Sequence, residues 1–363
     1  MNNQRKGCEG VNILAFNIGS TSTKIVFSVG EEEVLREAIE YKSEALVQYA
    51  DFGDQLPMRQ KDIEVFIRRH GLEMKNLDMI VSRGGVGKPA PAGAYRINEA
   101  MCEDVLSGRY GKHAANLGPP IAYNMARKCG AKAIVVDPPT TDEFHPLARV
   151  TGIPELERQS GFHALNQKAA ARRAARDMGK RYEAVNLVVA HLGGGITIGA
   201  HRKGAVIDAT HGLSEGPLTP ERAGALPILP LLELAFSGQF DMKKLQRKLV
   251  GQGGLFAYLG TSNATKVEKM IHEGDEKANF IYEVMIYQIA KDIGAMAVVL
   301  KGEIDGIVLT GGLAHSEMIT NGIKKYVEFL APVFIYPGED EMRSLEEGAL
   351  RVLRGEEELK EYR

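Results

Sequence analysis

The chain has 363 residues, enough for two domains, because a single hydrophobic core rarely grows beyond roughly 250–300 residues. Its 44% hydrophobic and 25% charged residues are typical of a folded globular protein and exclude a disordered or fibrous chain. The 45 basic and 47 acidic side chains give a net charge of −2, so we expect no broad positive field and no nucleic-acid partner.

The sequence shows no sign of a membrane protein. The first ten residues lack the apolar core of a signal peptide, and the longest apolar run, residues 225–236, contains two prolines and a glutamate and is too short to span a bilayer. We therefore expect a cytoplasmic protein with no membrane partner. Its cysteines are odd in number and too widely spaced for a disulfide framework or a zinc site. They are Cys8, Cys102 and Cys129.

Strands and helices interleave in the first part of the chain, as they do in α/β proteins. Residues 11–18 form an apolar run that predicts a buried strand, and residues 24–29 and 33–41 complete a meander around the turn that follows it. The next predicted elements are a helix over 62–70, a strand over 77–82, helices over 98–106 and 114–128, and a strand over 133–136.

A stretch rich in proline and short polar residues, from Asp137 to Pro146, predicts the crossover between two domains. We expect a first domain over residues 1–147, completed by a C-terminal helix over 344–363, and a second domain over 148–343. The elements predicted in the second part are a helix over 163–178, a second meander ending at Asp208, a helix over 276–301, a strand over 304–309 and a helix over 345–354.

Two distant segments of the chain are similar to each other. Residues 12–24 and 186–198 align without a gap, so that Asn17 is matched by His191 and Gly19 by Gly193. Each segment is an apolar run that enters a glycine-centred turn. A strand, a phosphate-binding turn and a second strand, present twice, predict two related domains that face one nucleotide.

The first of these turns, Gly19-Ser20-Thr21-Ser22-Thr23-Lys24, has the composition of a phosphate site. Backbone N–H groups in such a turn form a concave anion site, and hydroxyl groups and an ammonium add charge-assisted hydrogen bonds. It is not a Walker A loop, because the second glycine and the Gly-Lys-Ser/Thr ending are missing. Glycines elsewhere predict a close approach of backbone to nucleotide. They are Gly193, Gly194 and Gly195 in the second turn, and Gly311 and Gly312 after the strand over 304–309.

Two arginines, Arg83 and Arg222, lie next to glycine-rich backbone, where a planar guanidinium can bind a carboxylate or a phosphate through two hydrogen bonds. Mg²⁺ with ATP needs only one or two protein carboxylates, because phosphates and waters complete its shell. Sequence spacing alone does not bring such groups together. The remaining candidates are His145, His163 and His191, and the acids Asp137, Asp142, Glu215 and Glu346.

Together these residues resemble the acetate and butyrate kinases of the acetokinase family over nearly the whole chain. Within that family the chain resembles the butyrate kinases: it is shorter than acetate kinases, has Ser82 before Arg83, and has Gln167 where acetate kinases have a second histidine. The motifs that carry the resemblance are Asn17 to Lys24, Ser82-Arg83-Gly84-Gly85, Val136-Asp137 with Asp142 to His145, Gly161-Phe162-His163, His191 to Gly195, Pro220-Glu221-Arg222-Ala223-Gly224, Gly311-Gly312 and Leu345-Glu346-Glu347.

The resemblance implies the duplicated α/β, ribonuclease H-like fold shared by actin, sugar kinases and Hsp70 nucleotide-binding domains, with a nucleotide cleft between two domains. It implies reversible phosphoryl transfer between ATP and a short-chain carboxylate, giving an acyl phosphate and ADP, with Mg²⁺ as cofactor. The partners implied are the small carboxylate or acyl phosphate and further copies of the chain, as a homodimer or a higher homo-oligomer.

The resemblance also implies roles for single residues. Arg83 and Arg222 hold the carboxylate and neutralise the transferring phosphoryl group, while His163 donates to its equatorial oxygens. An aspartate near the crossover orients an arginine or Mg²⁺; Asp137 is favoured over Asp142, although the longer loop leaves the match ambiguous. The remaining implied roles are Asn17 and Glu346 as the Mg²⁺ pair, Ser20, Ser22 and Lys24 at the phosphates, and His191, Gly193, Gly194, Gly195, Gly311 and Gly312 along the ATP.

The chemistry of the step fits this set of residues. A carboxylate is already ionised at neutral pH, so the transfer needs charge neutralisation and in-line positioning rather than a general base. Three alternatives stay open: an acetate or propionate kinase, a sugar kinase of the same superfamily, which needs an aspartate to take a hydroxyl proton, and an actin-like ATP-binding assembly protein.

Overall fold

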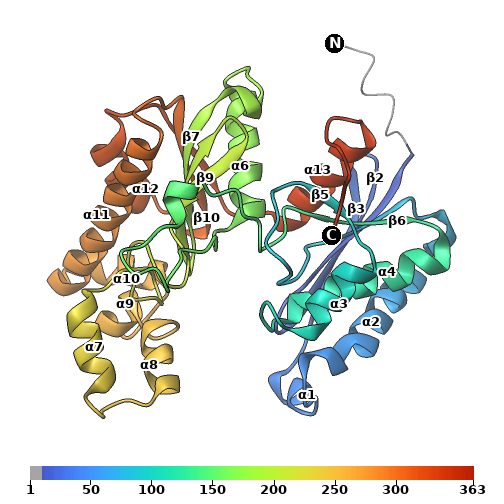
Figure 1. Cartoon of the computed structure of the whole chain (residues 1–363), viewed down its shortest axis with the longest axis horizontal. Coiled ribbons are helices and arrows are strands. Elements are labelled where there is room, and N and C mark those ends of the chain that lie inside the picture. The colour runs from blue at the N-terminus through green and yellow to red at the C-terminus, as the bar shows by residue number, and fades with distance from the viewer. Residues whose placement is uncertain (1–9) are drawn as a thin grey trace. The chain divides into compact units, whose positions relative to one another are not determined.

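A computed structural model describes residues 10–363 (Figure 1), so Cys8 and most of the N-terminal segment considered above lie outside the described residues. The chain divides into two compact units. The first contains Met1–Thr141 together with Asp340–Arg363, and the second contains Asp142–Glu339. The boundary at Thr141 lies inside the proline-rich stretch, and the C-terminal segment belongs to the first unit.

Within residues 10–363, the first unit is built on a seven-stranded sheet with the order β12-β5-β6-β4-β1-β2-β3. The strands β1, β2 and β3 form an antiparallel meander, and β4 and β6 continue the sheet parallel to β1. The strands are β1 (Asn12–Ile18), β2 (Ser22–Val29), β3 (Glu32–Glu40), β4 (Met79–Ser82), β5 (Ala94–Arg96), β6 (Lys132–Val136) and β12 (Lys360–Glu361).

Helices cover both faces of this sheet. Alternate residues of β1 point to opposite faces, so Leu14 and Phe16 pack with α2 and α4, while α13 packs on the other face against β1, β4 and β6. Gly348 allows that close packing, because a Cβ there would overlap the side chain of Val136. The helices are α1 (Ser43–Val47), α2 (Leu56–Arg69), α3 (Glu99–Ser107), α4 (Gly118–Cys129) and α13 (Glu341–Leu353).

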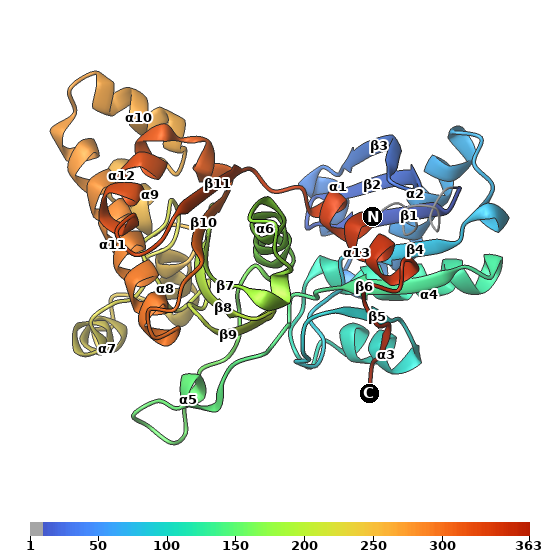
Figure 2. The ribbon, with the colours of Figure 1, turned by 90° about the horizontal axis from the view of Figure 1, so that it is seen from above.

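The second unit, all of whose residues are described, has a five-stranded sheet with the order β11-β10-β7-β8-β9. Figure 2 shows α6 on one face and α11 and α12 on the other, and Val188 and Ala190 of β7 pack in the core formed with α11. The elements are β7 (Asn186–Leu192), β8 (Ile196–Arg202), β9 (Ala205–Ala209), β10 (Gly306–Gly311), β11 (Val333–Pro337), α5 (Pro146–Arg149), α6 (Ala164–Asp177), α7 (Ile228–Phe236), α8 (Met242–Leu249), α9 (Gly254–Leu259), α10 (Ala264–His272), α11 (Glu276–Val299) and α12 (Glu317–Val327).

The internal repeat corresponds to a repeated structure. In the first unit β1 ends at Ile18 and β2 begins at Ser22; in the second, β7 ends at Leu192 and β8 begins at Ile196, which are the aligned positions. Each hairpin continues into a third antiparallel strand and has a parallel strand beside its first member. The predicted α/β fold with a duplicated strand-turn-strand unit is therefore confirmed.

Several predicted boundaries differ from the observed ones for identifiable reasons. The helix expected over 114–128 begins with a separate 3₁₀ turn, and α4 starts at Gly118, because Pro119 and Pro120 lack the N–H that an interior helical turn requires. The last helix begins at Glu341, four residues before the predicted start at 345, because Asp340 caps it by accepting a hydrogen bond from the N–H of Arg343. This earlier start places Glu341 at the first helical position. The helix ends at Leu353 and is followed by the strand β12, so the C-terminal helix expected over 344–363 does not reach the end of the chain.

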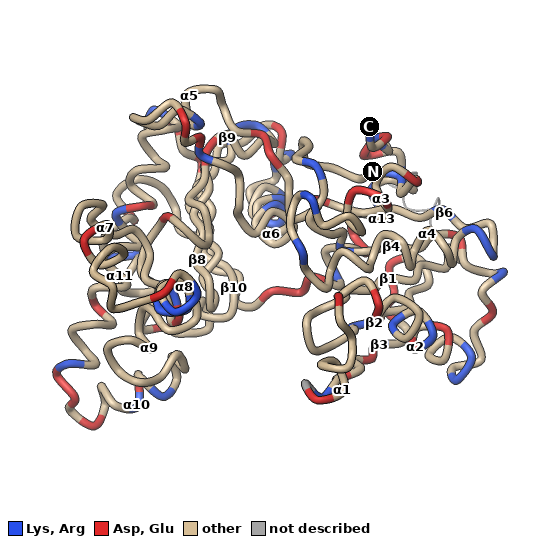
Figure 3. Tube along the Cα trace, turned by 60° about the horizontal axis from the view of Figure 1, so that its bottom comes forward, with Lys and Arg blue, Asp and Glu red and all other residues tan. Residues whose placement is uncertain are grey.

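Among the residues that the structure describes, no helix combines the length and the apolar character needed to cross a membrane. Basic and acidic residues are interspersed along the trace of each unit (Figure 3), in agreement with the small net charge of −2.

Candidate active site

Three polar side chains of the first unit converge where β1 and β4 end. The amide of Asn17 donates to Oε2 of Glu341 at 2.6 Å, and Nε of Arg83 donates to Oε1 of the same carboxylate at 2.8 Å. Asn17 is the buried penultimate residue of β1, Arg83 follows β4, and Glu341 begins α13. The parallel pairing of β1 with β4 brings the first two together, since carboxyl ends of parallel strands lie at one edge of a sheet.

Glu341 was not singled out by the sequence analysis, and a usable signal was present. Asp340 is a good N-cap residue, and acidic residues favour the first turn of a helix because they complement the helix dipole. Recognition of the cap places a carboxylate at the start of α13. What the sequence does not contain is the distance to Asn17, which depends on how α13 packs on the sheet.

Glu346, the carboxylate expected beside Asn17, lies further along α13 on its buried side. It is 1% exposed, and neither carboxylate oxygen has a hydrogen-bond partner. Burial raises the pKa of Glu346 to about 7, with a smaller contribution from the negative charge of Glu33. The structure thus brings Glu341, rather than Glu346, into contact with Asn17.

The β1–β2 turn presents the predicted phosphate-binding groups. The N–H of Gly19 donates to the carbonyl of Ser22 at 2.8 Å, which closes the turn, and Asn17 lies opposite Lys24 in the hairpin register. The side chains of Ser20 and Lys24 are exposed, and that of Ser22 is half-buried. Hydroxyl and ammonium groups are therefore displayed at the strand reversal, as an anion site requires.

Arg59 of α2 holds this turn through hydrogen bonds to its backbone. Its guanidinium is fully buried and donates to the carbonyls of Ser20 at 3.1 Å and Ser22 at 2.9 Å, and to the hydroxyl of Thr23 at 3.1 Å. The Arg59 guanidinium also lies 4.0 Å from the centre of the Tyr41 ring. Sequence reasoning missed Arg59, because an arginine on an amphipathic helix usually faces solvent.

The glycines after Arg83 are required by close backbone packing. A Cβ on Gly85 would lie 2.6 Å from Cα of Asn116, and Gly84 has a φ of +84°. The side chain of Asn116, which is fully buried, accepts from the N–H of Val86 at 2.8 Å. Asn116 therefore fixes the loop that carries Arg83.

The two candidate aspartates have different environments. Asp137 directly follows β6, has a φ of +40°, is 2% exposed, and accepts from the N–H of Gly93 at 2.9 Å. A non-glycine residue in left-handed backbone is strained, and such strain gathers at functional sites. Asp142 instead receives two hydrogen bonds from Arg149, at 2.8 and 2.7 Å, and a third from the N–H of Phe144. The bidentate pair with Arg149 gives Asp142 a structural task. Glu215 is likewise engaged, with Arg158.

In the second unit, Arg222 packs directly on the glycine turn that follows β7. Its guanidinium donates to the carbonyl of Gly212 at 2.6 Å and occupies the position that a Cβ on Gly195 would take. The hydroxyl of Thr219 donates to the carbonyl of Gly194 at 2.7 Å, which ties the Arg222 loop to the turn. Burial lowers the pKa of Arg222, and its Nε is buried without a hydrogen-bond partner.

The two predicted histidines of the second unit lie against each other. His163, immediately before α6, and His191, near the end of β7, stack with ring centres 3.8 Å apart and an angle of 17° between the planes. Burial lowers the pKa of His191 well below its ordinary value, so its ring is neutral. Nδ1 of His191 lies 2.8 Å from Oδ1 of Asn166, which can only accept, so Nδ1 carries the proton.

Gly311, the last residue of β10, and Gly312, which follows it, differ in what surrounds them. Gly311 has a φ of +91°, and a Cβ there would overlap the backbone of Leu192, so this glycine allows close packing of β10 on β7. Gly312 is exposed, and a Cβ there would meet no atom within 4 Å. A ligand could therefore approach the backbone closely at Gly312, whereas Gly311 is needed for the packing of β10 against β7.

Within the described residues, no group of three or more histidine, cysteine, aspartate or glutamate side chains is arranged to hold a metal ion. Mg²⁺ bound together with a nucleotide takes one or two protein oxygens and fills the rest of its shell with phosphates and waters. Oxygens of Asn17 and Glu341 are the groups that could supply such ligands, and the buried, unpaired Nε of Arg222 fits an anion.

Known proteins share this architecture. The structure resembles acetate kinase from Porphyromonas gingivalis, with a TM-score of 0.75, 18% identity, and coverage of 94% of this chain and 100% of the other. It resembles acetate kinase from Entamoeba histolytica, with a TM-score of 0.76, 16% identity, and coverage of 93% and 98%. It also resembles a propionate kinase from Francisella tularensis subsp. tularensis SCHU S4, with a TM-score of 0.70, 17% identity, and coverage of 93% of this chain and 98% of the other.

These identities establish the fold alone. The sequence profile of the acetokinase family, however, matches residues 150–332, half of the chain. That segment contains His163, His191, the Gly193–Gly195 turn and Arg222, whose mutual contacts are described above. The chain belongs to the acetokinase family.

Proposed function

We propose that this protein is a butyrate kinase that transfers the terminal phosphoryl group of ATP reversibly to butyrate or a similar short-chain or branched carboxylate. The products are an acyl phosphate and ADP, and Mg²⁺ accompanies the nucleotide. The observation that carries the proposal is Arg222, whose guanidinium lies on the Gly195 turn with a buried and unpaired Nε. A buried cation with an unused donor calls for an anion.

The proposed chemistry assigns a task to each group. Arg222 and Arg83 bind the carboxylate and neutralise the charge that develops on the transferring phosphoryl group, and His163 donates a hydrogen bond to it. No general base is required, since the acceptor is already ionised. The exposed hydroxyl of Ser20 and ammonium of Lys24, with Ser22, steady the nucleotide phosphates, and Gly193, Gly194 and Gly312 allow its close approach.

Mg²⁺ would be held by Asn17 and Glu341, which already contact each other. When bound, the ion supplies positive charge to the phosphate oxygens. Arg83 donates to the other oxygen of Glu341 and so orients that carboxylate without help from a metal ion. Asp137, at the strained end of β6, is the aspartate we assign to the site; Asp142 belongs to the pair with Arg149.

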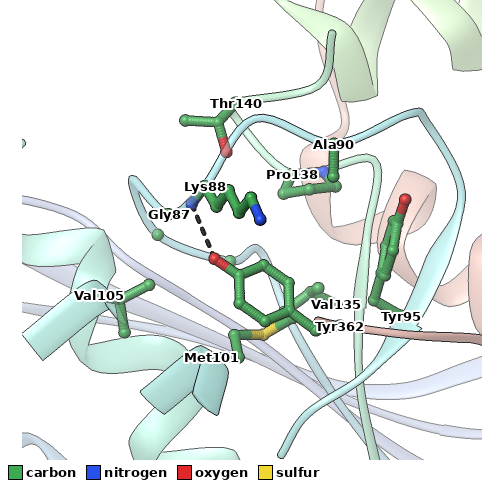
Figure 4. A pocket seen from close by; sticks show the side chains of 12 residues that line it. Gly87, Lys88, Ala90, Tyr95, Met101, Val105, Val135, Pro138, Thr140 and Tyr362 are labelled. Carbon is green, nitrogen blue, oxygen red and sulfur yellow. Dashed lines mark hydrogen bonds between the residues drawn. The ribbon is translucent and has the colours of Figure 1, made fainter. Parts of the chain in front are cut away.

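An acyl chain longer than acetyl needs an apolar space beside the carboxylate. A small cavity of about 20 Å³ lies next to Gly84 and Gly85, directly after Arg83 in the chain (Figure 4). Its lining is mostly apolar, and the Tyr362 hydroxyl on its wall is already engaged by the N–H of Lys88 at 2.7 Å. We propose that this cavity receives the end of the acyl chain. Its other lining side chains include Tyr95, Met101, Val105 and Val135.

The test is hydroxamate formation from ATP, hydroxylamine and acids of increasing length. We expect the highest kcat/KM at four carbons. A maximum at two or three carbons would instead make the protein an acetate or propionate kinase. These are the activities by which the similar structures are named. Formation of no hydroxamate with any acid would reject carboxylate kinase activity and leave the sugar kinase and the actin-like alternatives. Sedimentation with and without ATP would then detect the filaments that the actin-like alternative requires.

The arginines provide a second test. Arg83→Ala and Arg222→Ala should each lower kcat/KM by about 10²–10⁴-fold, the scale observed when one transition-state donor is removed. Arg149→Ala is the matched control, because that arginine pairs with Asp142. Turnover close to that of the unmodified protein in both site variants would overturn the assignment.

The homo-oligomer expected from the resemblance is also a proposal. Helix α7 has no buried residue, although most of its side chains are apolar, including Ile228, Leu229 and Phe236, which are 73%, 71% and 86% exposed. An apolar helix of this kind is typical of a contact surface. We expect the double variant Leu229→Glu/Phe236→Glu to reduce the mass measured by light scattering, and an unchanged mass would place the contact elsewhere.

A further inference from the structure

A chain of buried hydrogen bonds runs from His163 into the interior of the second unit. Nδ1 of His163 lies 2.9 Å from the hydroxyl of Thr197 in β8, and that hydroxyl lies 2.8 Å from Nε2 of Gln167 in α6. Oε1 of Gln167 lies 3.0 Å from Nε2 of His201, and Nδ1 of His201 lies 2.7 Å from the hydroxyl of Tyr182. Four of these five side chains are buried, with Thr197, Gln167 and His201 at 0% exposure.

The orientation of the Gln167 amide is fixed by a neighbour that can only accept. Its nitrogen lies 3.1 Å from the backbone carbonyl of Thr197, so this end must be the NH₂ group and the oxygen must face His201. Gly199 makes room for that oxygen, because a Cβ at residue 199 would lie 2.5 Å from it. Gln167 is therefore a donor toward Thr197 and an acceptor toward His201.

The direction of the next two bonds follows. Burial lowers the pKa of His201 well below its ordinary value, and the nearby charges of Lys168 and Arg172 act in the same sense, so the ring is neutral and carries one proton. Because Gln167 presents an acceptor to Nε2, that proton is on Nε2. Nδ1 of His201 is then an acceptor, and the Tyr182 hydroxyl donates to it.

The direction at His163 follows from the hydroxyl of Thr197. This oxygen accepts from Gln167 and receives the more distant N–H of His163 at 3.4 Å, both of which are donors. Among the partners of Thr197 in the described part of the chain, Nδ1 of His163 is the acceptor within reach of its hydroxyl proton. A buried hydroxyl requires an acceptor, so Thr197 donates to Nδ1 of His163, which leaves Nε2 as the ring nitrogen that carries the proton.

We propose that Gln167 is a positioning residue that acts through Thr197 to hold His163 in the tautomer with the proton on Nε2, with its ring plane set by the stacked His191. This inference rests on the proposed function in one respect, namely that the Nε2–H group of His163 is the donor to the phosphoryl oxygens. The tautomer itself is a property of the protein without bound nucleotide or carboxylate, and it does not depend on that function. Which nitrogen of a histidine carries the proton is set by the hydrogen bond at the other nitrogen.

The proposal makes a distinction between shape and hydrogen-bond polarity at position 167. Methionine is close to glutamine in length but offers neither the donor nor the acceptor of its amide. Histidine differs more in shape and has one N–H donor fewer than the glutamine amide, yet it still offers a donor and an acceptor. If polarity governs His163, Gln167→His retains function better than Gln167→Met. If packing alone matters, the order reverses.

The first measurement is the ring ¹⁵N spectrum of the nucleotide-free protein, with His163 assigned by comparison with His163→Gln. We expect a protonated Nε2 and an unprotonated Nδ1 in the original protein, a mixture of tautomers or the Nδ1–H form in Gln167→Met, and the original pattern in Gln167→His. The same His163 pattern in all three proteins, or a protonated Nδ1 in the original protein, would overturn the proposal.

The second measurement is the hydroxamate rate. Gln167→Met should lower kcat by about 10–100-fold, the usual scale for a residue that orients a functional histidine, with KM for ATP nearly unchanged, and Gln167→His should recover most of the loss. Gln246→Met, on the exposed face of α8, is the control. If the original protein forms no hydroxamate, the proposed function fails while the spectra still decide the tautomer. If it does and kcat of Gln167→Met is unchanged, the positioning role fails alone.

Discussion

The side-chain amide of Asn17 donates to Oε2 of Glu341 at 2.6 Å, and this contact joins the end of β1 to the first residue of α13, more than three hundred positions later in the chain. We predict that Glu341→Gln lowers hydroxamate formation by about 10²-fold or more and raises the Mg²⁺ concentration needed for half-maximal rate, because one charged ligand is lost. The measurement is the rate as a function of Mg²⁺ concentration.

The matched control for Glu341 is Glu347→Gln, on the same helix. Glu346→Gln is the informative comparison, since Glu346 is the carboxylate that the resemblance implied. A strong loss for Glu346→Gln with no effect of Glu341→Gln would restore the original assignment.

Glu346 should make stability depend on pH. Burial raises its pKa to about 7 from an ordinary value of 4.5. Between these values the folded protein holds a proton that the unfolded chain releases, so the stability contributed by this group is full below pH 4.5 and is lost as the pH rises toward 7. Glu346→Gln does not titrate. Its free energy of unfolding, measured with urea, should therefore rise by about 1–3 kcal/mol relative to that of the original protein between pH 5 and pH 8. Parallel stability curves for the two proteins would contradict this expectation.

The two aspartates near the unit boundary should respond differently to the same substitution. Asp137→Asn should lower turnover by about tenfold or more, because the charge is lost at a residue we assign to the site, while asparagine tolerates the left-handed backbone that Asp137 adopts. Asp142→Asn should leave turnover within a few fold and reduce thermal stability slightly, because only the pair with Arg149 is weakened. Initial rates and melting temperatures of both variants decide the matter, and the opposite ranking of rates would assign Asp142 to the site.

Arg59→Met should destabilise the first unit and weaken nucleotide binding. The substitution removes the buried guanidinium that donates to the carbonyls of Ser20 and Ser22, and only Ser22 keeps a second donor within the described residues, the N–H of Gly19, so we expect a cost of about 2–4 kcal/mol. We expect a higher KM for ATP and an earlier transition in urea. Arg68→Met, an exposed position on the same helix, is the control. Unaltered KM and stability in Arg59→Met would show that the turn does not depend on this arginine.

The cavity beside Gly84 predicts a specificity change. Ala90 lines it, and Ala90→Leu should fill it. The ratio of kcat/KM for butyrate to kcat/KM for acetate should fall by about 10–200-fold, which is the discrimination that an apolar pocket achieves for one methylene group. Ala45→Leu, at an exposed position in α1, should leave the ratio unchanged. A proportional loss on both acids would mean that the cavity does not receive the acyl chain.

The sequence by itself determined the α/β class, the duplicated hairpins and most of the strands, because apolar runs and glycine turns are local patterns. The ends of β1 and β7 coincide with the aligned positions of the repeat, which local residue order is sufficient to specify. It also determined that Arg222 adjoins glycine-rich backbone. These properties need no knowledge of distant neighbours.

Only the tertiary structure decided which side chains meet. The partner of Asn17 is Glu341 because α13 returns across the sheet, and the support of the β1–β2 turn is Arg59 because α2 packs beneath it. The hydrogen-bond polarity of Gln167 is set by a carbonyl of β8. Such contacts depend on packing between elements far apart in the chain, and the periodicity of one element states which face is buried without stating what it is buried against.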